Sequence, residues 1–200
     1  LGPTHHTTED IALMRTLPNM TIFSPIDPLE TKKATIEAAR IKGPVYLRLA
    51  TDRSPEIYKE DYEFKTGCAI VLREGKNIAI ISTGGIVYEV LKAVDELESL
   101  KISVRLINIH TIKPIDKEII LKAASDIGAI LTVEEHTVIG GLGSAVSEVL
   151  LENNSMPIKF KRLGLNGIFA EGYGSYEEMK EMNGLSKRDI VEAVKNMVKN

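Results

Sequence analysis

The adjacent histidines His5 and His6 are the first residues in the chain that could take part in chemistry. They follow Gly2-Pro3 and come just before a predicted helix, where a backbone can approach a ligand closely. An imidazole at such a place can donate or accept a hydrogen bond, or move a proton near neutral pH. We expect at most one of the two to face a given site. The pair also fits a surface position or a simple helix cap.

Arg48 is the charged residue in an otherwise apolar predicted strand, residues 45–50. A guanidinium near the carboxyl end of a buried strand is costly unless it meets an anion. Ligands of open α/β sheets bind at this edge, so the anion could belong to a ligand. It could equally be a structural carboxylate from Asp10, Asp27 or Asp52. The sequence leaves both alternatives open.

Two glycine-rich turns, residues 82–85 and 140–144, each follow a predicted strand and lead into a helix. Free N–H groups at such a turn can bind phosphate, but neither turn has the full dinucleotide-binding pattern or a P-loop lysine. Close packing of strand and helix is the simpler interpretation.

After one strand come Glu134 and Glu135, followed by His136. Because adjacent strand residues face opposite ways, we expect one carboxylate to be buried or paired and the other solvated. We expect no metal site.

The predicted elements that position these residues alternate between helix and strand, so the predicted fold class is α/β. In residues 1–52 we expect helices at 7–17 and 28–41 and strands at 20–23 and 45–50. So few elements cannot cover both faces of a parallel sheet, so this part should be incomplete as a domain. We therefore expect it to belong to a larger polypeptide or to a trimmed chain. Residues 53–66 are polar and without periodicity, which predicts a linker.

Residues 67–200 show a more regular alternation. We expect strands at 69–72, 77–81, 102–109, 129–133 and 158–163, with helices between them and a last helix capped by Ser186. This order predicts a doubly wound, mostly parallel five-stranded sheet with helices on both faces. The first two strands fit either a hairpin or an edge strand beside a central one.

The composition sets limits on the function. The 200 residues are 44% hydrophobic and 26% charged, which is enough for a sizeable core. The net charge of −3 argues against a nucleic-acid partner. No apolar run approaches the ~18 residues that cross a bilayer, and the single cysteine excludes a disulfide framework. We expect a soluble, cytoplasmic protein without a membrane partner.

Several strings in the sequence together resemble the transketolase family. Residues 2–5, 12–19 and 44–49 resemble its pyrimidine-binding domain, and residues 79–84, 112–116 and 132–144 resemble its C-terminal domain. Their order and spacing make the similarity specific along nearly the full chain. The enzyme 1-deoxyxylulose-5-phosphate synthase and the β chain of 2-oxo-acid dehydrogenases share this architecture, but the string Arg15–Asn19 is most similar to transketolase itself.

The resemblance implies an enzyme of pentose phosphate metabolism that uses thiamine diphosphate and a divalent metal such as Mg²⁺. It would transfer a two-carbon ketol unit between sugar phosphates. His5 matches the family's catalytic histidine, which hydrogen-bonds the substrate oxygens, and Arg48 matches the arginine that binds the sugar phosphate. His6 stands where glutamine is usual and is a further substrate-binding candidate. Leu1 stands where aspartate is frequent, which leaves the identity of the sugar open.

The resemblance also implies that the chain is only part of a catalyst. The family's cofactor-activating glutamate and its residues for metal and diphosphate lie upstream of this stretch, so no cofactor-binding residue is assigned here. We expect the chain alone to be inactive, to form a homodimer, and to require an N-terminal half or subunit that carries the diphosphate-binding domain. The alternatives are a free-standing α/β binding or dimerisation module and, less favoured by the incomplete glycine pattern, a nicotinamide or flavin oxidoreductase domain.

Overall fold

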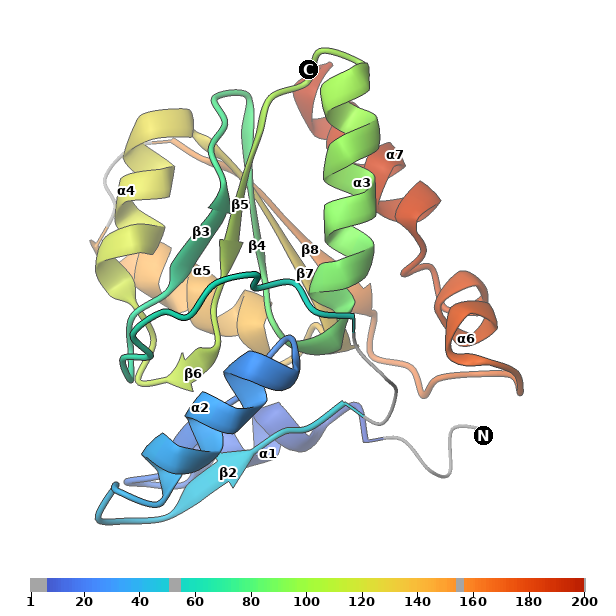
Figure 1. Ribbon diagram of the computed structural model, residues 1–200. Coiled ribbons are helices and arrows are strands. Elements are labelled where there is room, and N and C mark those ends of the chain that lie inside the picture. Colours follow the sequence, from blue (N-terminus) through green and yellow to red (C-terminus); the bar gives the residue numbers. More distant parts are fainter. Residues whose placement is uncertain (1–6, 51–54, 154–156, 200) are drawn as a thin grey trace.

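The computed structural model describes residues 7–50, 55–153 and 157–199. Figure 1 shows two sheets, with the smaller one, built largely from the blue N-terminal elements, packed against one end of the larger one. The predicted α/β class is confirmed, as is a larger sheet of five strands that is mostly parallel. No helix within the described ranges is long and apolar enough to span a bilayer.

The smaller sheet has the strand order β2-β1-β6. Its strands β1 (Thr21–Phe23) and β2 (Val45–Leu47) pair in parallel, with the helix α2 (Pro28–Ala38) between them in the chain. The helix α1 (Asp10–Thr16) precedes them. The third strand, β6 (Thr111–Lys113), comes from the second half of the chain and runs antiparallel to β1. It was not predicted, because a pairing so distant in sequence leaves no local signal.

The larger sheet has the order β3-β5-β4-β7-β8. Its strands are β3 (Ile70–Arg73), β4 (Ile78–Ser82), β5 (Val104–Asn108), β7 (Ala129–Thr137) and β8 (Lys159–Leu165). The hairpin alternative is wrong, because β5 lies between β3 and β4, and β3 is an antiparallel edge strand. The turn that joins β3 to β4 crosses close over the start of β5. A Cβ on Gly75 would overlap the backbone of Val104, so the crossing requires glycine.

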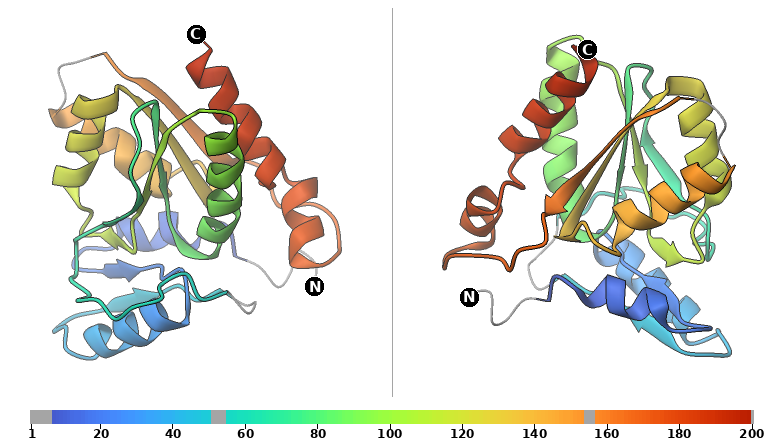
Figure 2. Two further views of the ribbon diagram at one scale, coloured as in Figure 1. Left: turned by 45° about the horizontal axis from the view of Figure 1, so that its top comes forward. Right: turned by 180° about the vertical axis from the view of Figure 1, so that it is seen from behind.

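Helices cover both faces of the larger sheet, as Figure 2 shows. The helices α3 (Val87–Ser99) and α7 (Lys187–Val198) pack on one face, and α4 (Lys117–Ile127) and α5 (Leu142–Asn153) pack on the other. The central strand β4 shows the period of two: Ile78 and Ile80 belong to the first core, and Ala79 and Ile81 to the second. All four of these residues are fully buried.

The short helix α6 (Tyr176–Met182) was not predicted, although the sequence carries a signal for it. The Ser175 side chain accepts a hydrogen bond from the backbone N–H of Glu178, and the Glu178 side chain bonds back to Ser175, which forms a capping box. The spacing of serine and glutamate in Ser175-Tyr176-Glu177-Glu178 is the pattern of this motif. The predicted Ser186 cap of α7 is present in the structure.

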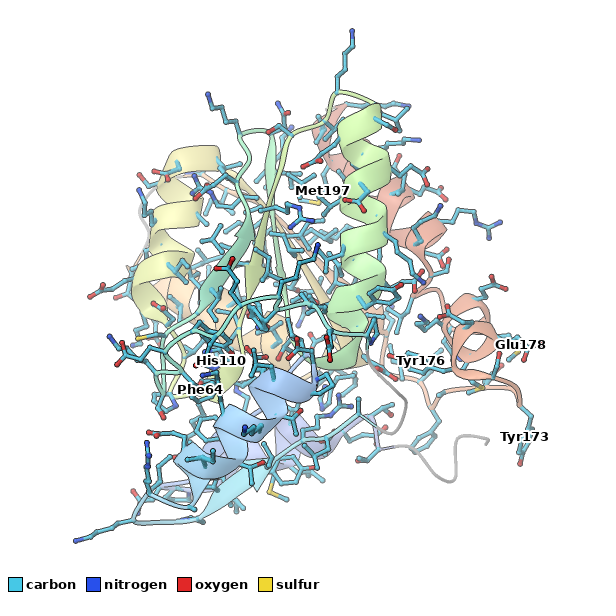
Figure 3. The ribbon with its side chains drawn as sticks, viewed as in Figure 1. Phe64, His110, Tyr173, Tyr176, Glu178 and Met197 are labelled. Atoms are coloured by element: carbon cyan, nitrogen blue, oxygen red, sulfur yellow. The ribbon has the colours of Figure 1, made fainter. Side chains whose placement is uncertain are left out.

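Residues 55–66, here called the connecting segment, have no helix or strand. Five of these residues are half-buried, namely Ile57, Tyr58, Tyr62, Phe64 and Thr66, and the others are exposed. The Tyr58 and Tyr62 hydroxyls donate to the carboxylate of Glu30 on α2. Phe64 contacts Phe23 edge-on. It also lies beside His110, as Figure 3 shows. The aromatic side chains of this part of the predicted linker therefore make specific contacts, while its charged side chains are exposed.

Candidate active site at the boundary of the two sheets

Arg48 lies where the carboxyl ends of β2 and β7 meet. The strand β2 ends at Leu47, so Arg48 follows it rather than lying within it, but its backbone N–H still bonds to Phe23. The guanidinium Nε donates to Asp10 at 3.0 Å, and Nη2 donates to the backbone carbonyls of Thr7 at 3.1 Å and Glu135 at 2.9 Å. Arg48 thus connects three places: Asp10 of α1, Thr7 before α1, and Glu135 of β7.

Asp10 is the structural carboxylate that meets Arg48, one of the three that the sequence offered. It begins α1 and is 6% exposed. Its Oδ2 atom also accepts a hydrogen bond from the Tyr46 hydroxyl at 2.8 Å. Burial, followed by the bond to Asp10, raises the pKa of Tyr46 to about 12. Asp27 is used elsewhere, as the cap of α2, and Asp52 lies outside the described residues.

The two adjacent carboxylates of β7 point to opposite sides, as predicted. Glu134 is fully buried and accepts hydrogen bonds from the backbone N–H groups of Leu142 and Gly143. Burial raises its pKa to about 7, and these two bonds oppose the rise. Glu135 is half-buried and accepts a hydrogen bond from the Tyr176 hydroxyl at 2.7 Å, so it is paired rather than freely solvated. Figure 3 shows Tyr176 on α6 directed toward the sheet.

The two glycine-rich turns serve close packing in this structure. At residues 140–143 the N–H groups at the start of α5 are taken by Glu134, and a Cβ on Gly141 would overlap that carboxylate. At residues 84–85 the Gly84 N–H bonds to the Ser24 carbonyl at 3.2 Å, and a Cβ there would meet the Ser24 hydroxyl at 2.8 Å. The simpler of the two interpretations therefore accounts for both turns.

A cavity beside Glu135 is too small for a sugar phosphate. Its volume is about 40 Å³, which holds a water molecule or two. It is lined by the residues Thr8, Glu135, Leu165, Ala170, Tyr176, Met179, Lys180, Asn183 and Leu185. The described residues therefore form no substrate-sized pocket at this place.

The predicted site residues His5 and His6 lie outside the described residues. The nearest described residue is Thr7, whose carbonyl Arg48 holds. Within the described ranges, no group of three or more His, Cys, Asp or Glu side chains could hold a metal ion. The described residues therefore offer no set of side-chain ligands for a divalent metal.

Sequence reasoning missed the contribution of Tyr176. Its partner Glu135 is 41 residues away in the chain, and α6 itself was not expected. The capping box could have revealed the helix, but not its contact with β7. Sequence reasoning did find Arg48, Asp10 and the acidic cluster at 134–136, whose relation to one another appears only in the fold.

Comparison with known proteins identifies the family. The model for the pyrimidine-binding domain of transketolase matches residues 1–55, and the model for the transketolase C-terminal domain matches residues 67–190. The chain belongs to the transketolase family.

Among curated proteins, the chain is 40% identical over 192 residues to the 6-deoxy-6-sulfo-D-fructose transketolase subunit SqwH of Clostridium sp. (strain MSTE9). That match covers 96% of this chain and 59% of that transketolase subunit. It is 38% identical over 193 residues to a subunit of the apulose-4-phosphate transketolase of Actinobacillus succinogenes, covering 96% of this chain and 61% of the relative.

Among solved structures, the fold is similar to that of a split gene transketolase described as an inactive beta4 tetramer. The TM-score is 0.92 and the identity 41%, and the match covers 99% of this chain and 64% of the other. The chain thus spans less than two thirds of the length of these transketolase relatives.

Proposed function

We propose that this chain is the C-terminal part of a transketolase-type transferase that moves a two-carbon ketol unit between sugar phosphates with thiamine diphosphate and Mg²⁺. The observation that carries the proposal is the pair of family matches, which follow one another along the chain in the order pyrimidine-binding domain, C-terminal domain. A place in pentose phosphate metabolism and a cytoplasmic location are part of the same proposal.

The proposed enzyme needs an N-terminal partner subunit. The relatives at 40% and 38% identity are named as subunits of transketolases, which supports a division of the enzyme between two chains. The described residues of this chain supply no set of metal ligands, so we assign the metal and diphosphate end of the cofactor to the partner. The related split gene transketolase is described as an inactive beta4 tetramer, which supports a chain that is inactive alone and associates with itself, at least as a homodimer.

In this proposal the substrate-facing residues of the chain are His5, His6 and Arg48. His5 hydrogen-bonds the substrate oxygens near the reacting carbon, where a donor stabilises developing charge. Arg48 binds the sugar phosphate. Its Nε and Nη2 atoms already bond within the chain, so Nη1 is the nitrogen that we assign to the phosphate. The contacts with Asp10 and β7 hold the guanidinium in place for that role.

Calorimetric titration of thiamine diphosphate with Mg²⁺ tests the division of the enzyme. The titration is run on this chain, on an N-terminal subunit, and on an equimolar mixture of the two. We expect this chain alone to give no binding heat and the mixture to bind the cofactor most tightly. Tight binding of a nucleotide such as ADP by this chain alone, with no gain from the mixture, would favour the free-standing binding module instead.

A further inference from the structure

The first turn of α1 lacks the usual cap from its own N-terminal residue. The first N–H groups of a helix have no partner within the helix, and a side chain at the N-cap position normally accepts one of them. Here the N-cap residue is Glu9, whose side chain makes no capping bond. Its carboxylate is instead bonded by the backbone N–H and the hydroxyl of Thr8.

His136 of β7, in the larger sheet, supplies the missing acceptor. Its Nε2 accepts the backbone N–H of Ala12, the third residue of α1, at 3.3 Å, although the two residues lie 124 positions apart. Its Nδ1 lies 2.6 Å from the Thr137 carbonyl. A carbonyl oxygen only accepts, so Nδ1 carries the proton and Nε2 is free to accept. The ring is fully buried, and burial lowers the pKa of His136, which keeps the ring neutral.

A second bond ties the residues before α1 to the same part of β7. The Thr137 N–H donates to the Thr8 carbonyl at 2.7 Å, so β7 holds the chain on both sides of Glu9. Arg48 adds a third connection, because its Nη2 joins the carbonyls of Thr7 and Glu135. Residues 7–12 are thus fixed by three hydrogen-bonding groups that belong to or contact residues 135–137.

We propose that His136 is a positioning residue that caps α1 from the larger sheet. The cap fixes residues 7–9, which precede α1, on the end of β7. Its consequence for catalysis rests on the proposed function, because residues 7–9 come immediately after the proposed substrate-facing pair His5 and His6 in the chain. The C-terminal unit then acts on the substrate-facing segment through a hydrogen bond, without touching substrate.

The cap requires an unprotonated Nε2. Protonation would place a donor opposite the Ala12 N–H and a positive charge at the positive end of the α1 dipole. The charged groups that face His136 are Asp10 on α1, whose Oδ1 lies 4.0 Å from Nε2, Glu134 on its own strand, and Arg48 after β2. Burial, the largest effect, and Arg48 lower the pKa of His136, whereas the backbone carbonyls of Thr137 and Glu9 and the Asp10 carboxylate raise it.

The test compares two substitutions at His136 with a matched histidine. His136→Phe keeps a planar aromatic ring, slightly larger than the imidazole, and removes the acceptor. His136→Gln places a carbonyl oxygen near the former Nε2. His110 is the control. It is also buried, and burial lowers its pKa to about 4, which keeps the ring neutral. Unlike His136, it packs on Phe64 rather than on α1.

Amide hydrogen exchange in the assembled enzyme measures the cap directly. We expect the Ala12 amide to exchange about fivefold faster or more in His136→Phe than in the wild type, to recover in His136→Gln, and to be unchanged in His110→Phe. Wild-type Ala12 protection should also fall on acidification, and this fall should be absent in His136→Gln. Equal Ala12 protection in His136→Phe and wild type would overturn the proposal, as would an equal loss in His110→Phe.

Steady-state kinetics of the same assembled variants test the catalytic consequence. We expect kcat to fall roughly tenfold or more in His136→Phe with little change in KM, because the misplaced segment affects the reacting geometry rather than the phosphate contact. His136→Gln should restore kcat. If no mixture with an N-terminal subunit transfers ketol units, the proposed function fails, while the exchange experiment still decides whether His136 caps α1.

Discussion

Arg48 and Glu30 each connect the smaller sheet to the rest of the molecule, but the two junctions use different chemistry. The Arg48 junction pairs a guanidinium with the Asp10 carboxylate, and both side chains are largely buried. The Glu30 junction places a fully buried carboxylate among uncharged donors: the Tyr58 and Tyr62 hydroxyls, the Asn108 amide and the backbone N–H of Ile26.

The difference shows what each junction tolerates. A buried ion pair depends on both partners, because loss of one leaves a buried charge without compensation. A carboxylate held by neutral donors can instead take up a proton, and burial raises the pKa of Glu30 to about 7. The Arg48 junction also contacts Thr7, next to the proposed substrate-facing segment, whereas the Glu30 junction holds the connecting segment. We therefore expect variants of the first to change activity and stability, and variants of the second to change stability alone.

The largest effect is expected for Asp10→Ala, which leaves the Arg48 guanidinium without its carboxylate and the Tyr46 hydroxyl without its acceptor. The free energy of unfolding should fall by about 3–5 kcal/mol. Urea unfolding followed by circular dichroism measures this loss. Asp10→Asn is the control, because its carbonyl can still accept one of the two bonds, and its loss should be smaller. A loss below about 1 kcal/mol for Asp10→Ala would mean that the ion pair does not hold the junction.

Arg48→Ala separates phosphate binding from a purely structural role. Hydrogen bonds to charged groups contribute about 1.5–3 kcal/mol, so kcat/KM for a phosphorylated acceptor should fall roughly tenfold or more beyond the fall for its unphosphorylated analogue. Both substrates are measured on the same assembled variant, so general damage from the unpaired Asp10 cancels in the ratio. An equal loss on both acceptors would restrict Arg48 to holding Thr7, Asp10 and Glu135 together.

Glu30→Gln should change how stability depends on pH. The unfolded carboxyl loses its proton near pH 4.5, whereas the folded one keeps it to about pH 7. The folded state therefore binds more protons in this interval, and the contribution of Glu30 to stability falls as pH rises from about 4.5 to 7.

Because glutamine does not ionise, the stability of Glu30→Gln relative to wild type should increase over this interval, by up to ~3 kcal/mol. Unfolding free energies at pH 4.5, 6 and 8 measure the trend, and kcat of the assembled enzyme should not change. A constant difference between the two proteins across this range would show that Glu30 ionises normally in the fold.

The smallest effect is expected for Tyr62→Phe, which removes one hydrogen bond to Glu30 and keeps the ring beside Tyr58. The loss should be about 1 kcal/mol, and greater at pH 8 than at pH 5, because the Tyr62 bond favours the ionised carboxylate. Thermal unfolding at both pH values measures it. Tyr88→Phe, at a half-exposed position on α3, is the matched control and should change stability by less than about 0.5 kcal/mol. Equal effects of the two substitutions would contradict the role of Tyr62.

Local signals in the sequence predicted much of the fold. Pro28, which suits a first helical position, marked the start of α2, Ser186 marked α7, and the apolar run at residues 78–81 marked the central strand. The partner of Arg48 was narrowed to three carboxylates, of which the fold selects Asp10. For the helices and the strand, the signal lies within or directly before the element that it predicts, whereas the choice of Asp10, 38 residues from Arg48, required the fold.

The remaining features depend on residues that are distant in the sequence. The pairing of β6 with β1 and the His136 cap on α1 arise only when the two units pack together. The connecting segment was predicted to be a linker because it is polar and charged and has no periodicity. The buried Glu30, which accepts hydrogen bonds from its tyrosines, lies about thirty residues earlier and leaves no local signal. Such contacts follow from tertiary packing, which periodicity does not encode.

The most direct test of the whole account is a titration of ketol-transfer activity, in which an N-terminal subunit is added to a fixed amount of this chain with thiamine diphosphate and Mg²⁺. We expect no activity without the partner, a rise to a plateau at equimolar subunits, and a plateau roughly 10²–10³-fold lower for His5→Ala at the same stoichiometry. Activity of this chain alone, or an undiminished plateau for His5→Ala, would contradict it.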